Sequence, residues 1–370
     1  MSTKNVCHLT SVHSRYDTRI FIKECRSLAK AGYVTSLVVA DGKGDELQDG
    51  INIHDVGALG GRLNRIFKTT KHVLEMALKI NADIYHLHDP ELLPIGLKLK
   101  HMGKHVIFDA HEDLPKQLLG KPYLGPLRLR FLASIVSLYE RYACSKMDGI
   151  VTATPYIRDK FLKINPRTVD VDNFPVLGEL DAVIPWADKR EEVCYVGGIG
   201  SIRGIRETVM ALELVQSNAR LNLGGRFVEP ALETEIKQHN GWSRVNELGF
   251  LDRLGVRDVL RRSVAGLVTL HPIINYLDAL PVKMFEYMAA GIPPIASNFP
   301  LWREIIEGND CGLCVDPLDP DAIAKAIDYL VTHPDEARRM GENGRKAVLE
   351  KYNWSIEEAK LLSFYDHILA

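Results

Sequence analysis

Residues 278–297 read DALPVKMFEYMAAGIPPIAS and predict a short helix with charged groups near its start. Pro281 suits the first helical position, because its missing N–H would have no partner there. Gly291 suits the position just after the last turn. A helix start offers free N–H groups and a positive dipole end, which favour an anion. Lys283 and Glu286 are three residues apart and so share a helix face. The segment therefore predicts an anion-binding site beside a cation and a carboxylate.

A nucleotide diphosphate sugar needs such a set, with positive charge for the diphosphate and carboxylates for the hydroxyl groups. The alternative is a capped amphipathic helix whose charges face water. The stretch resembles the acidic signature of the retaining glycosyltransferases of family 4, in which two glutamates separated by seven residues precede Ala-Met-Ala-x-Gly-x-Pro. Glu286 matches the second acid, residues 287–293 (YMAAGIP) match the Ala-Met-Ala-x-Gly-x-Pro part, and Asp278 replaces the first glutamate.

The resemblance implies an α/β chain with the GT-B fold, in which two Rossmann-like domains face each other across a cleft. The first domain would bind the acceptor and the second the donor. In this family the residue that matches Glu286 binds the ribose hydroxyls, and the one that matches Asp278 binds hydroxyls of the donor sugar. His111 resembles the histidine that the family holds against that sugar. These three are the expected catalytic residues.

The order of elements agrees with two such domains. Short apolar runs predict strands at 5–9, 34–40, 51–56, 83–88, 105–109 and 149–153, and then at 192–196, 220–223 and 264–270. A further strand should begin at Pro294, a position where sheets tolerate proline. Helical patterns lie between them, at 17–31, 62–80, 91–102, 127–145, 204–216 and 281–290. This alternation is typical of doubly wound parallel sheets. We expect a first domain at 1–173, a linker at 174–190 and a second domain at 191–353. The resemblance implies that a last helix, 354–370, returns to the first domain.

The loop after the strand 192–196 is a second candidate for donor binding. It reads YVGGIGSIRGI from Tyr195 to Ile205, and its glycines let N–H groups approach a phosphate. It resembles the family's phosphate loop, with Gly198 in place of an arginine and Arg203 in place of a lysine. The alternative is an ordinary turn from strand to helix. The remaining donor-side candidates are Gly200 in this loop, Gly225 and Arg226 in a second glycine turn, and Leu280 and Val282 at the start of the 281–290 helix.

Polar residues also follow three strands of the first domain. They are the acceptor-side candidates, and comprise His13, Asp17 and Arg19 after the first strand, His88 and Asp89 in HLHDPELLP, and Glu112 beside His111 in FDAHEDLP. Catalytic groups favour the carboxyl ends of strands in open α/β sheets. Asp17 could instead cap the following helix, and Arg19 could be solvated. Histidines and acids could also gather a metal ion, but no H-E-x-x-H or similar ligand spacing is present. We therefore expect these residues to form hydrogen bonds and not to bind a metal ion. Neither a metal nor another cofactor is expected.

Composition limits the possible partners. A formal net charge of −2 gives no overall attraction to nucleic acid, and none is expected as a partner. The start of the chain is no signal peptide, and no apolar run approaches the length of a bilayer span. We expect a cytoplasmic protein. The stretches 61–73 and 121–146 mix basic and apolar residues, which predicts helices with a solvated basic face or, alternatively, peripheral contact with the cytoplasmic membrane.

These observations predict transfer of a sugar from a UDP- or GDP-sugar to a hydroxyl of a saccharide or lipid-linked acceptor. Retention of configuration and a role in cell-surface polysaccharide synthesis rest on the resemblance. Two alternatives stay open: a nucleotide-sugar epimerase of the same fold, and a non-catalytic subunit that binds a nucleotide.

Overall fold

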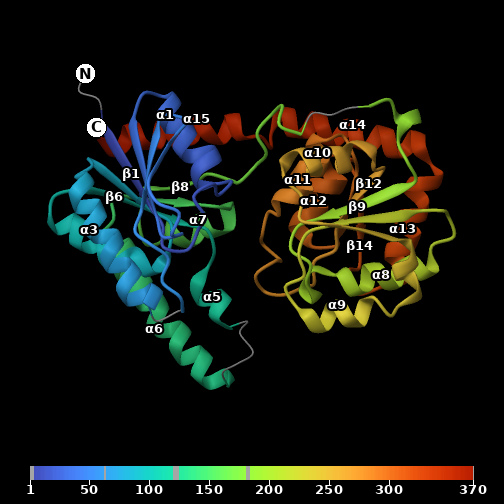
Figure 1. Cartoon of the computed structure of the whole chain (residues 1–370), viewed down its shortest axis with the longest axis horizontal. Helices are drawn as coiled ribbons and strands as arrows, with labels where there is room; N and C mark the ends of the chain where they lie inside the picture. Colours follow the sequence, from blue (N-terminus) through green and yellow to red (C-terminus); the bar gives the residue numbers. More distant parts are fainter. Residues whose placement is uncertain (1–3, 62–63, 120–124, 181–183, 370) are drawn as a thin grey trace. The chain divides into compact units, whose positions relative to one another are not determined.

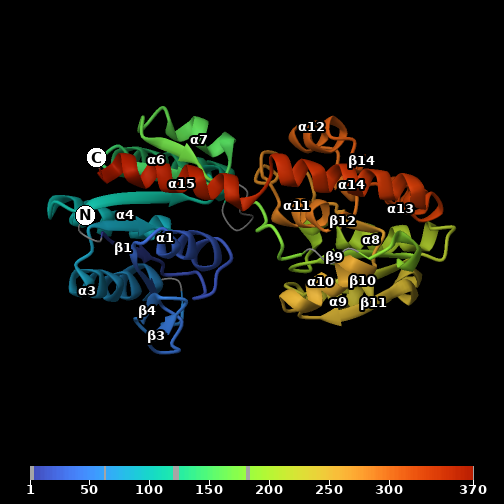
Figure 2. The ribbon, with the colours of Figure 1, turned by 90° about the horizontal axis from the view of Figure 1, so that it is seen from above.

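The computed structural model describes residues 4–61, 64–119, 125–180 and 184–369. The chain forms two compact units, each described here by itself (Figures 1 and 2). The first unit comprises Met1–Asn173 and Ser355–Ala370, and the second Phe174–Trp354. The segment expected as a linker, 174–190, belongs to the second unit, and its residues 181–183 lie outside the described part.

The first unit is built on a sheet in the order β3-β4-β2-β1-β5-β6-β7-β8. The described strands are parallel, except that β3 runs antiparallel to β4. Their bounds are β1 Asn5–Leu9, β2 Val34–Val39, β3 Glu46–Gln48, β4 Ile51–Asp55, β5 Ile84–Leu87, β6 His105–Ala110, β7 Gly149–Thr152 and β8 Thr168–Asp170. The helical elements are η1 Ile20–Cys25, α1 Arg26–Lys30, η2 Arg65–Thr69, α3 Thr70–Ile80, η3 Pro90–Leu92, α4 Leu93–His101, α5 Leu114–Leu119, α6 Pro126–Cys144, α7 Pro155–Phe161 and α15 Trp354–Leu369.

The second unit contains a parallel sheet in the order β11-β10-β9-β12-β13-β14. Its strands are β9 Glu192–Val196, β10 Arg220–Gly224, β11 Val245–Gly249, β12 Ala265–Val268, β13 Pro294–Ser297 and β14 Leu313–Val315. Its helices are η4 Trp186–Asp188, η5 Ser201–Arg203, α8 Ile205–Leu214, α9 Pro230–Ile236, η6 Asn240–Arg244, α10 Arg253–Arg262, α11 Val282–Ala289, α12 Pro300–Gly308, α13 Pro320–Thr332 and α14 Pro334–Glu350. This strand order is that of the Rossmann fold. The prediction of two doubly wound α/β sheets is confirmed.

The helix expected at 281–290 differs from the prediction by one residue at its start. It begins at Val282, and Pro281 is its N-cap with extended backbone (ψ 120°). Gly291 follows the helix with a φ of +70°, as expected for the residue after the last turn. Sequence patterns predicted no strand at β3, β8, β11 or β14. Of these, β3, β8 and β14 have only three residues each, which is too few to show a period.

The helix expected at 17–31 begins three residues later, as the π-helical segment η1, and continues as α1. The Asp17 carboxylate accepts hydrogen bonds from the N–H groups of Arg19 (2.9 Å) and Ile20 (3.0 Å), so it caps this helix start. No helix among the described residues is both long enough and apolar enough to cross a bilayer.

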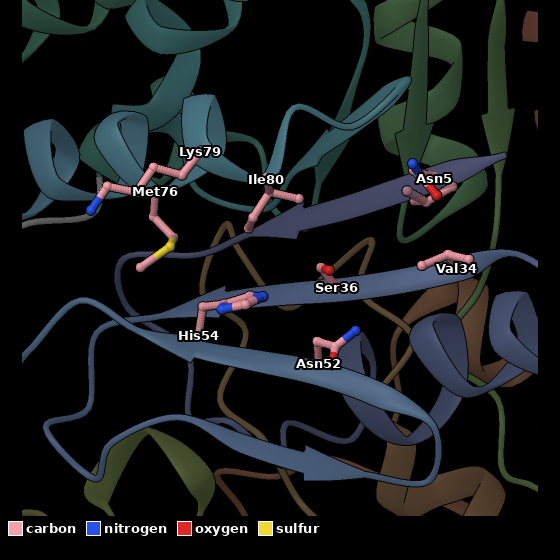
Figure 3. A pocket seen from close by; sticks show the side chains of 9 residues that line it. Asn5, Val34, Ser36, Asn52, His54, Met76, Lys79 and Ile80 are labelled. Carbon is pink, nitrogen blue, oxygen red and sulfur yellow. The ribbon is translucent and has the colours of Figure 1, made fainter.

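A pocket of about 360 Å³ lies in the first unit between α3 and the strands β1, β2 and β4 (Figure 3). Asn5 and Val34, which line it, begin β1 and β2. The acceptor-side candidates lie at the opposite edge of this sheet, after the carboxyl ends of β1, β5 and β6. This pocket is therefore separate from the candidate site.

Candidate active site

The donor-side candidates lie at the point where the strand order of the second sheet reverses. Strand β9 has β10 on one side and β12 on the other. The loop after β9 carries Gly198, Gly200 and Arg203, and α11, which carries Lys283 and Glu286, comes after β12. In open α/β sheets ligands bind outside the carboxyl ends of the strands at such a reversal. The two segments chosen from the sequence therefore meet at the place where this fold favours a ligand.

Close backbone packing shapes the turns after β9 and β10. Gly197 and Gly225 have φ values of +140° and +145°. A Cβ atom on Gly225 would lie 1.8 Å from the Gly197 carbonyl oxygen, and the Gly197 N–H donates to the Gly224 carbonyl (2.9 Å). Gly225 is thus required for packing between the turns. Sequence reasoning missed Gly197, although the glycine pair in the loop signals it.

Lys283 contributes a buried cation to the donor-side candidates. Its Nζ lies 3.7 Å from the centre of the Tyr195 ring and is buried without a hydrogen-bond partner among the described residues. Burial, aided by the nearby Arg203 charge, lowers the pKa of Lys283 to about 7, and Glu286 opposes this shift. A Cβ on Gly197 would lie 2.9 Å from the Lys283 Nζ. Glycine at position 197 therefore leaves room for the Lys283 ammonium beside the loop after β9.

The N–H groups of that loop are only partly occupied. The Ser201 N–H and hydroxyl donate to the Glu229 carboxylate at 3.0 and 2.8 Å, a contact that the sequence did not reveal. In the part of the chain that the structure describes, the N–H groups of Gly198 and Gly200 have no hydrogen-bond partner. Arg203 lies over the loop, since a Cβ on Gly198 would be 3.8 Å from its Nε. Two N–H donors, a guanidinium and an ammonium thus gather within one small region.

Glu286 is held by an arginine that sequence reasoning missed. Arg253 Nη1 donates to Glu286 Oε1 at 2.7 Å, and its Nε donates to Glu179 Oε1, also at 2.7 Å. Arg253 begins α10, and only the fold brings it to α11, so no local pattern could have found it. Asp278 lies half-buried in the turn before α11, where Trp302 Nε1 donates to the Ala279 carbonyl at 2.7 Å and fixes the backbone.

The remaining donor-side candidates differ in their surroundings. Leu280 and Val282 are half-buried at the start of α11, where the first N–H groups of a helix lack partners within the helix. Arg226 is exposed, and its guanidinium carbon lies 4.9 Å from the centre of the Phe250 ring.

A second group of candidates meets at the carboxyl edge of the first sheet. His13 Nδ1 lies 3.3 Å from Asp17 Oδ2, and His13 Nε2 lies 3.5 Å from Asp89 Oδ1. The rings of His13 and His111 are 5.0 Å apart between centres. Asp89 is buried and accepts from the Ser11 N–H at 2.6 Å. Burial opposes protonation of His13, but Asp17 and Asp89 outweigh it and raise its pKa.

Behind this edge, Arg19 and Asp109 form a buried ion pair. Arg19 Nε and Nη2 donate to the two Asp109 oxygens at 2.8 Å, and Nη1 donates to the Val171 carbonyl at 2.6 Å. His111 Nε2 lies 2.9 Å from Asp109 Oδ2. Burial alone would raise the pKa of Asp109, but Arg19 and His111 hold it well below its usual range. Arg19 is therefore not solvated, and it acts on His111 through Asp109.

The buried network continues through three histidines and Glu24. His88 Nε2 lies 2.8 Å from His8 Nδ1, and His86 Nδ1 lies 2.7 Å from the Tyr365 hydroxyl. Burial lowers the pKa of His88 to about 4 and those of His8 and His86 well below the usual range. Burial, with the Asp109 charge, raises the pKa of Glu24 well above its usual range. Arg19 opposes this shift, because its Nε also lies 3.2 Å from Glu24 Oε1.

Among the described residues, two sets could hold a metal ion. His8, Glu24, His86 and His88 form one set, and His88, Asp109 and His111 form the other, each with ligand atoms within 4.8 Å of one another. Three imidazoles and a carboxylate suit Zn²⁺. In the first set, however, Glu24 already lies 3.2 Å from the Arg19 guanidinium, whose positive charge would repel a cation. Sequence reasoning missed His8 and Glu24, because in sequence they belong to a strand and a helix.

Glu112 stays apart from this network. It is exposed, and Gln117 Nε2 donates a hydrogen bond to it. It therefore presents its carboxylate at the surface beside the His111 loop.

Comparisons with known proteins agree with this geometry. The model of glycosyl transferases group 1 matches residues 178–347, and that of glycosyltransferase family 4 matches residues 19–171. The MMP alpha-(1->4)-mannosyltransferase of Mycolicibacterium hassiacum is 26% identical over 163 residues, which cover 42% of this chain and 39% of that relative. The chain therefore aligns with well under two thirds of the length of this curated relative.

Solved structures match almost the whole chain. Sucrose-phosphate synthase of Thermosynechococcus elongatus superposes with a TM-score of 0.78 at 18% identity, over 99% of both chains. Anabaena HepE in complex with UDP-glucose superposes with a TM-score of 0.73 at 12% identity, over 98% of this chain and 99% of that one. The two family models and the shared architecture show that this chain belongs to the group 1 glycosyltransferases of family 4, with the GT-B fold.

Proposed function

We propose that the chain transfers a hexose-type sugar from a UDP- or GDP-sugar to a hydroxyl of a saccharide or glycolipid, with retention of configuration. One observation carries this proposal: the Lys283 ammonium, which has no hydrogen-bond partner among the described residues, lies near Arg203. The N–H groups of Gly198 and Gly200 in the same loop also have no partner among those residues. A diphosphate would satisfy all of these donors at once. The names of relatives support the donor class, since one is a mannosyltransferase and one solved structure contains UDP-glucose.

In this proposal each donor group has one role. Arg203, Lys283 and the N–H groups of Gly198, Gly200 and the α11 start hold the diphosphate. Glu286 accepts from the ribose hydroxyls, in an orientation that Arg253 fixes. Asp278 accepts from hydroxyls of the sugar.

The chemistry needs no nucleophile from the protein. Fixed charges and N–H dipoles stabilise the departing diphosphate in the transition state without reorganising. The acceptor hydroxyl attacks from the face that the diphosphate leaves, and a phosphate oxygen takes its proton. His111 donates a hydrogen bond to the donor sugar, while His13, Asp17 and Glu112 offer polar groups to the acceptor. Arg19, His88 and Asp89 are buried and support those groups from behind.

Three possible activities can be separated with purified protein. Nucleotide sugars are first screened by thermal shift, since a ligand of the folded state raises the melting temperature. The donor that binds is then incubated with and without saccharide acceptors. Transfer that depends on the acceptor supports the proposal. An isomerised nucleotide sugar would indicate an epimerase, and binding without turnover would indicate a non-catalytic subunit.

Glu286→Ala tests the assignment of the site. We expect near-complete loss of transfer with an unchanged melting temperature, because the carboxylate is partly exposed and its loss leaves no buried gap. Glu233→Ala, which removes a partly exposed carboxylate on α9, is the control and should behave as wild type. Wild-type donor affinity and turnover in Glu286→Ala would refute the assignment.

The proposal also includes turnover without a metal ion, since Arg203 and Lys283 supply the positive charge. Activity should survive dialysis against EDTA, with bound metals measured by atomic emission before and after. Activity that is lost and then restored by magnesium or manganese would overturn this part of the proposal. It would direct attention to His88, Asp109 and His111, one of the two sets that could hold a metal ion.

A further inference from the structure

Helix α6 carries an apolar stripe that faces solvent. Leu127, Phe131, Ile135, Leu138 and Tyr142 are spaced at four, four, three and four residues, which places them on one side of the helix. Their exposed fractions are 79%, 70%, 48%, 70% and 55%. Figure 1 shows α6 extending beyond the sheet of the first unit.

The opposite side of α6 already packs against its unit. Leu129, Ala133, Ala143 and Cys144 are buried there. The helix therefore has two apolar sides, and only one is covered within the described residues. The exposed side differs from the solvated basic face that the sequence suggested, because its centre is apolar and the basic residues border it.

The charge that α6 shows to solvent is wholly positive. Arg128, Arg130 and Arg141 are exposed. Glu140, the acid of this helix, is buried and pairs with Lys160 at 2.5 Å. The stripe therefore lies between arginines without an exposed carboxylate on the same helix.

A groove of about 510 Å³ continues this surface towards α3 and α4. It is lined by Phe67, Lys71, Leu74, Lys98 and Tyr139, among others. Phe67 is 70% exposed. Glu91 also lines the groove and pairs with Arg65 at 2.8 Å. Apolar and aromatic groups thus extend the stripe beyond α6.

We propose that this surface, the stripe of α6 with Phe67, docks the first unit on a bilayer that contains anionic lipid. Apolar side chains along one helix can enter the boundary between headgroups and acyl chains, while arginines at the border bind lipid phosphates. The same charges disfavour a second copy of the chain as the occupant, because two such faces would bring their arginines together without exposed acids on α6 to pair them. The inference is independent of which sugar or acceptor the enzyme uses.

Vesicle flotation of the full chain tests this inference. Vesicles of equal parts phosphatidylcholine and phosphatidylglycerol are compared with vesicles of phosphatidylcholine alone. We expect binding to the anionic vesicles that weakens as salt is added, and little binding to the neutral ones. The variant Leu127→Ser/Phe131→Ser/Leu138→Ser should bind at least about tenfold more weakly, because insertion scales with buried apolar area. These side chains are exposed, so the variant should keep the wild-type melting temperature.

A matched variant controls for the loss of surface hydrophobicity. Leu47→Ser/Leu254→Ser/Leu318→Ser changes three leucines that are 68%, 68% and 50% exposed and lie outside the stripe. It should bind anionic vesicles as wild type does. Absence of wild-type binding, or equal binding by the stripe variant, would overturn the inference. A wild-type dimer that the stripe variant converts to a monomer, measured by light scattering without vesicles, would also overturn it and identify a second copy as the occupant.

Discussion

At the residue scale, the burial of the Lys283 ammonium has a cost for the folded protein. Its ammonium is buried with no hydrogen-bond acceptor in the described part of the chain, and its pKa is lowered to about 7. In the unfolded chain the same group titrates near its ordinary value of 10.5. The unfolded state therefore binds more protons between these two values, and the free energy of unfolding should rise with pH across that window.

Lys283→Met should remove this dependence while it keeps most of the side-chain volume. We expect the variant to be as stable as wild type or more stable at pH 7, and to show a flatter pH dependence of unfolding between about pH 7 and 10. Its donor affinity should fall roughly tenfold or more, since a charged hydrogen bond to phosphate is lost. Urea unfolding and calorimetric donor titration measure the two effects.

Lys283→Arg serves as the comparison, because arginine stays charged throughout this range. Wild-type donor binding should weaken above pH 7 as the ammonium loses its proton, and the arginine variant should lack that trend. A wild-type affinity that is constant from about pH 6 to 9 would contradict the role given to Lys283.

At the element scale, the position of α11 depends on a close contact with α14. A Cβ on Gly341 would lie 2.1 Å from the carbonyl oxygen of Gly291, the residue that follows α11. Helix α11 carries Lys283 and Glu286. Gly341 therefore sets how closely the site helix approaches its neighbour, although it lies far from the site in sequence.

Gly341→Ala should force the two helices apart. We expect a loss of about 1–3 kcal/mol in the free energy of unfolding, as for other overpacked contacts, together with weaker donor binding. Gly308→Ala is the matched control, because no described atom lies within 4 Å of the added Cβ and alanine favours the helix. Chemical unfolding of both variants would reject the contact argument if Gly341→Ala proved as stable as its control.

At the scale of the whole molecule, each unit carries one set of polar groups at the carboxyl edge of its sheet. The second unit gathers cations and N–H groups around Lys283, and the first gathers His13, Asp89 and His111. This arrangement suggests a division of labour, in which the second unit holds the donor and the first acts mainly during transfer.

His111→Ala should then lower turnover by roughly 10- to 100-fold with little change in donor affinity, because one hydrogen bond made mainly in the transition state is lost. Arg203→Ala should instead weaken donor binding by a similar factor. His105→Ala, on the partly exposed start of β6, is the control. Calorimetric donor titration and kinetics at saturating acceptor distinguish the two. Equal loss of donor affinity in both variants would refute the division.

Local sequence patterns predicted the long strands and two segments of the candidate site. Alternating apolar runs predicted the long strands of both sheets, because burial on two faces of a parallel sheet leaves a continuous apolar signal. The α11 segment and the glycine loop after β9 were found because Pro, Gly and charge positions at a helix start have local physical causes.

Only the tertiary structure decided which distant residues share a site. Arg253 reaches Glu286, Glu229 occupies the Ser201 N–H, and the Tyr365 hydroxyl meets His86 across 279 residues. Parallel strands bring such positions together through crossovers of many residues, and no period in the sequence records which strands become neighbours. The sequence therefore determined the elements and the motif. The strand order decided the partners, the burial and thus the protonation of the groups beside them.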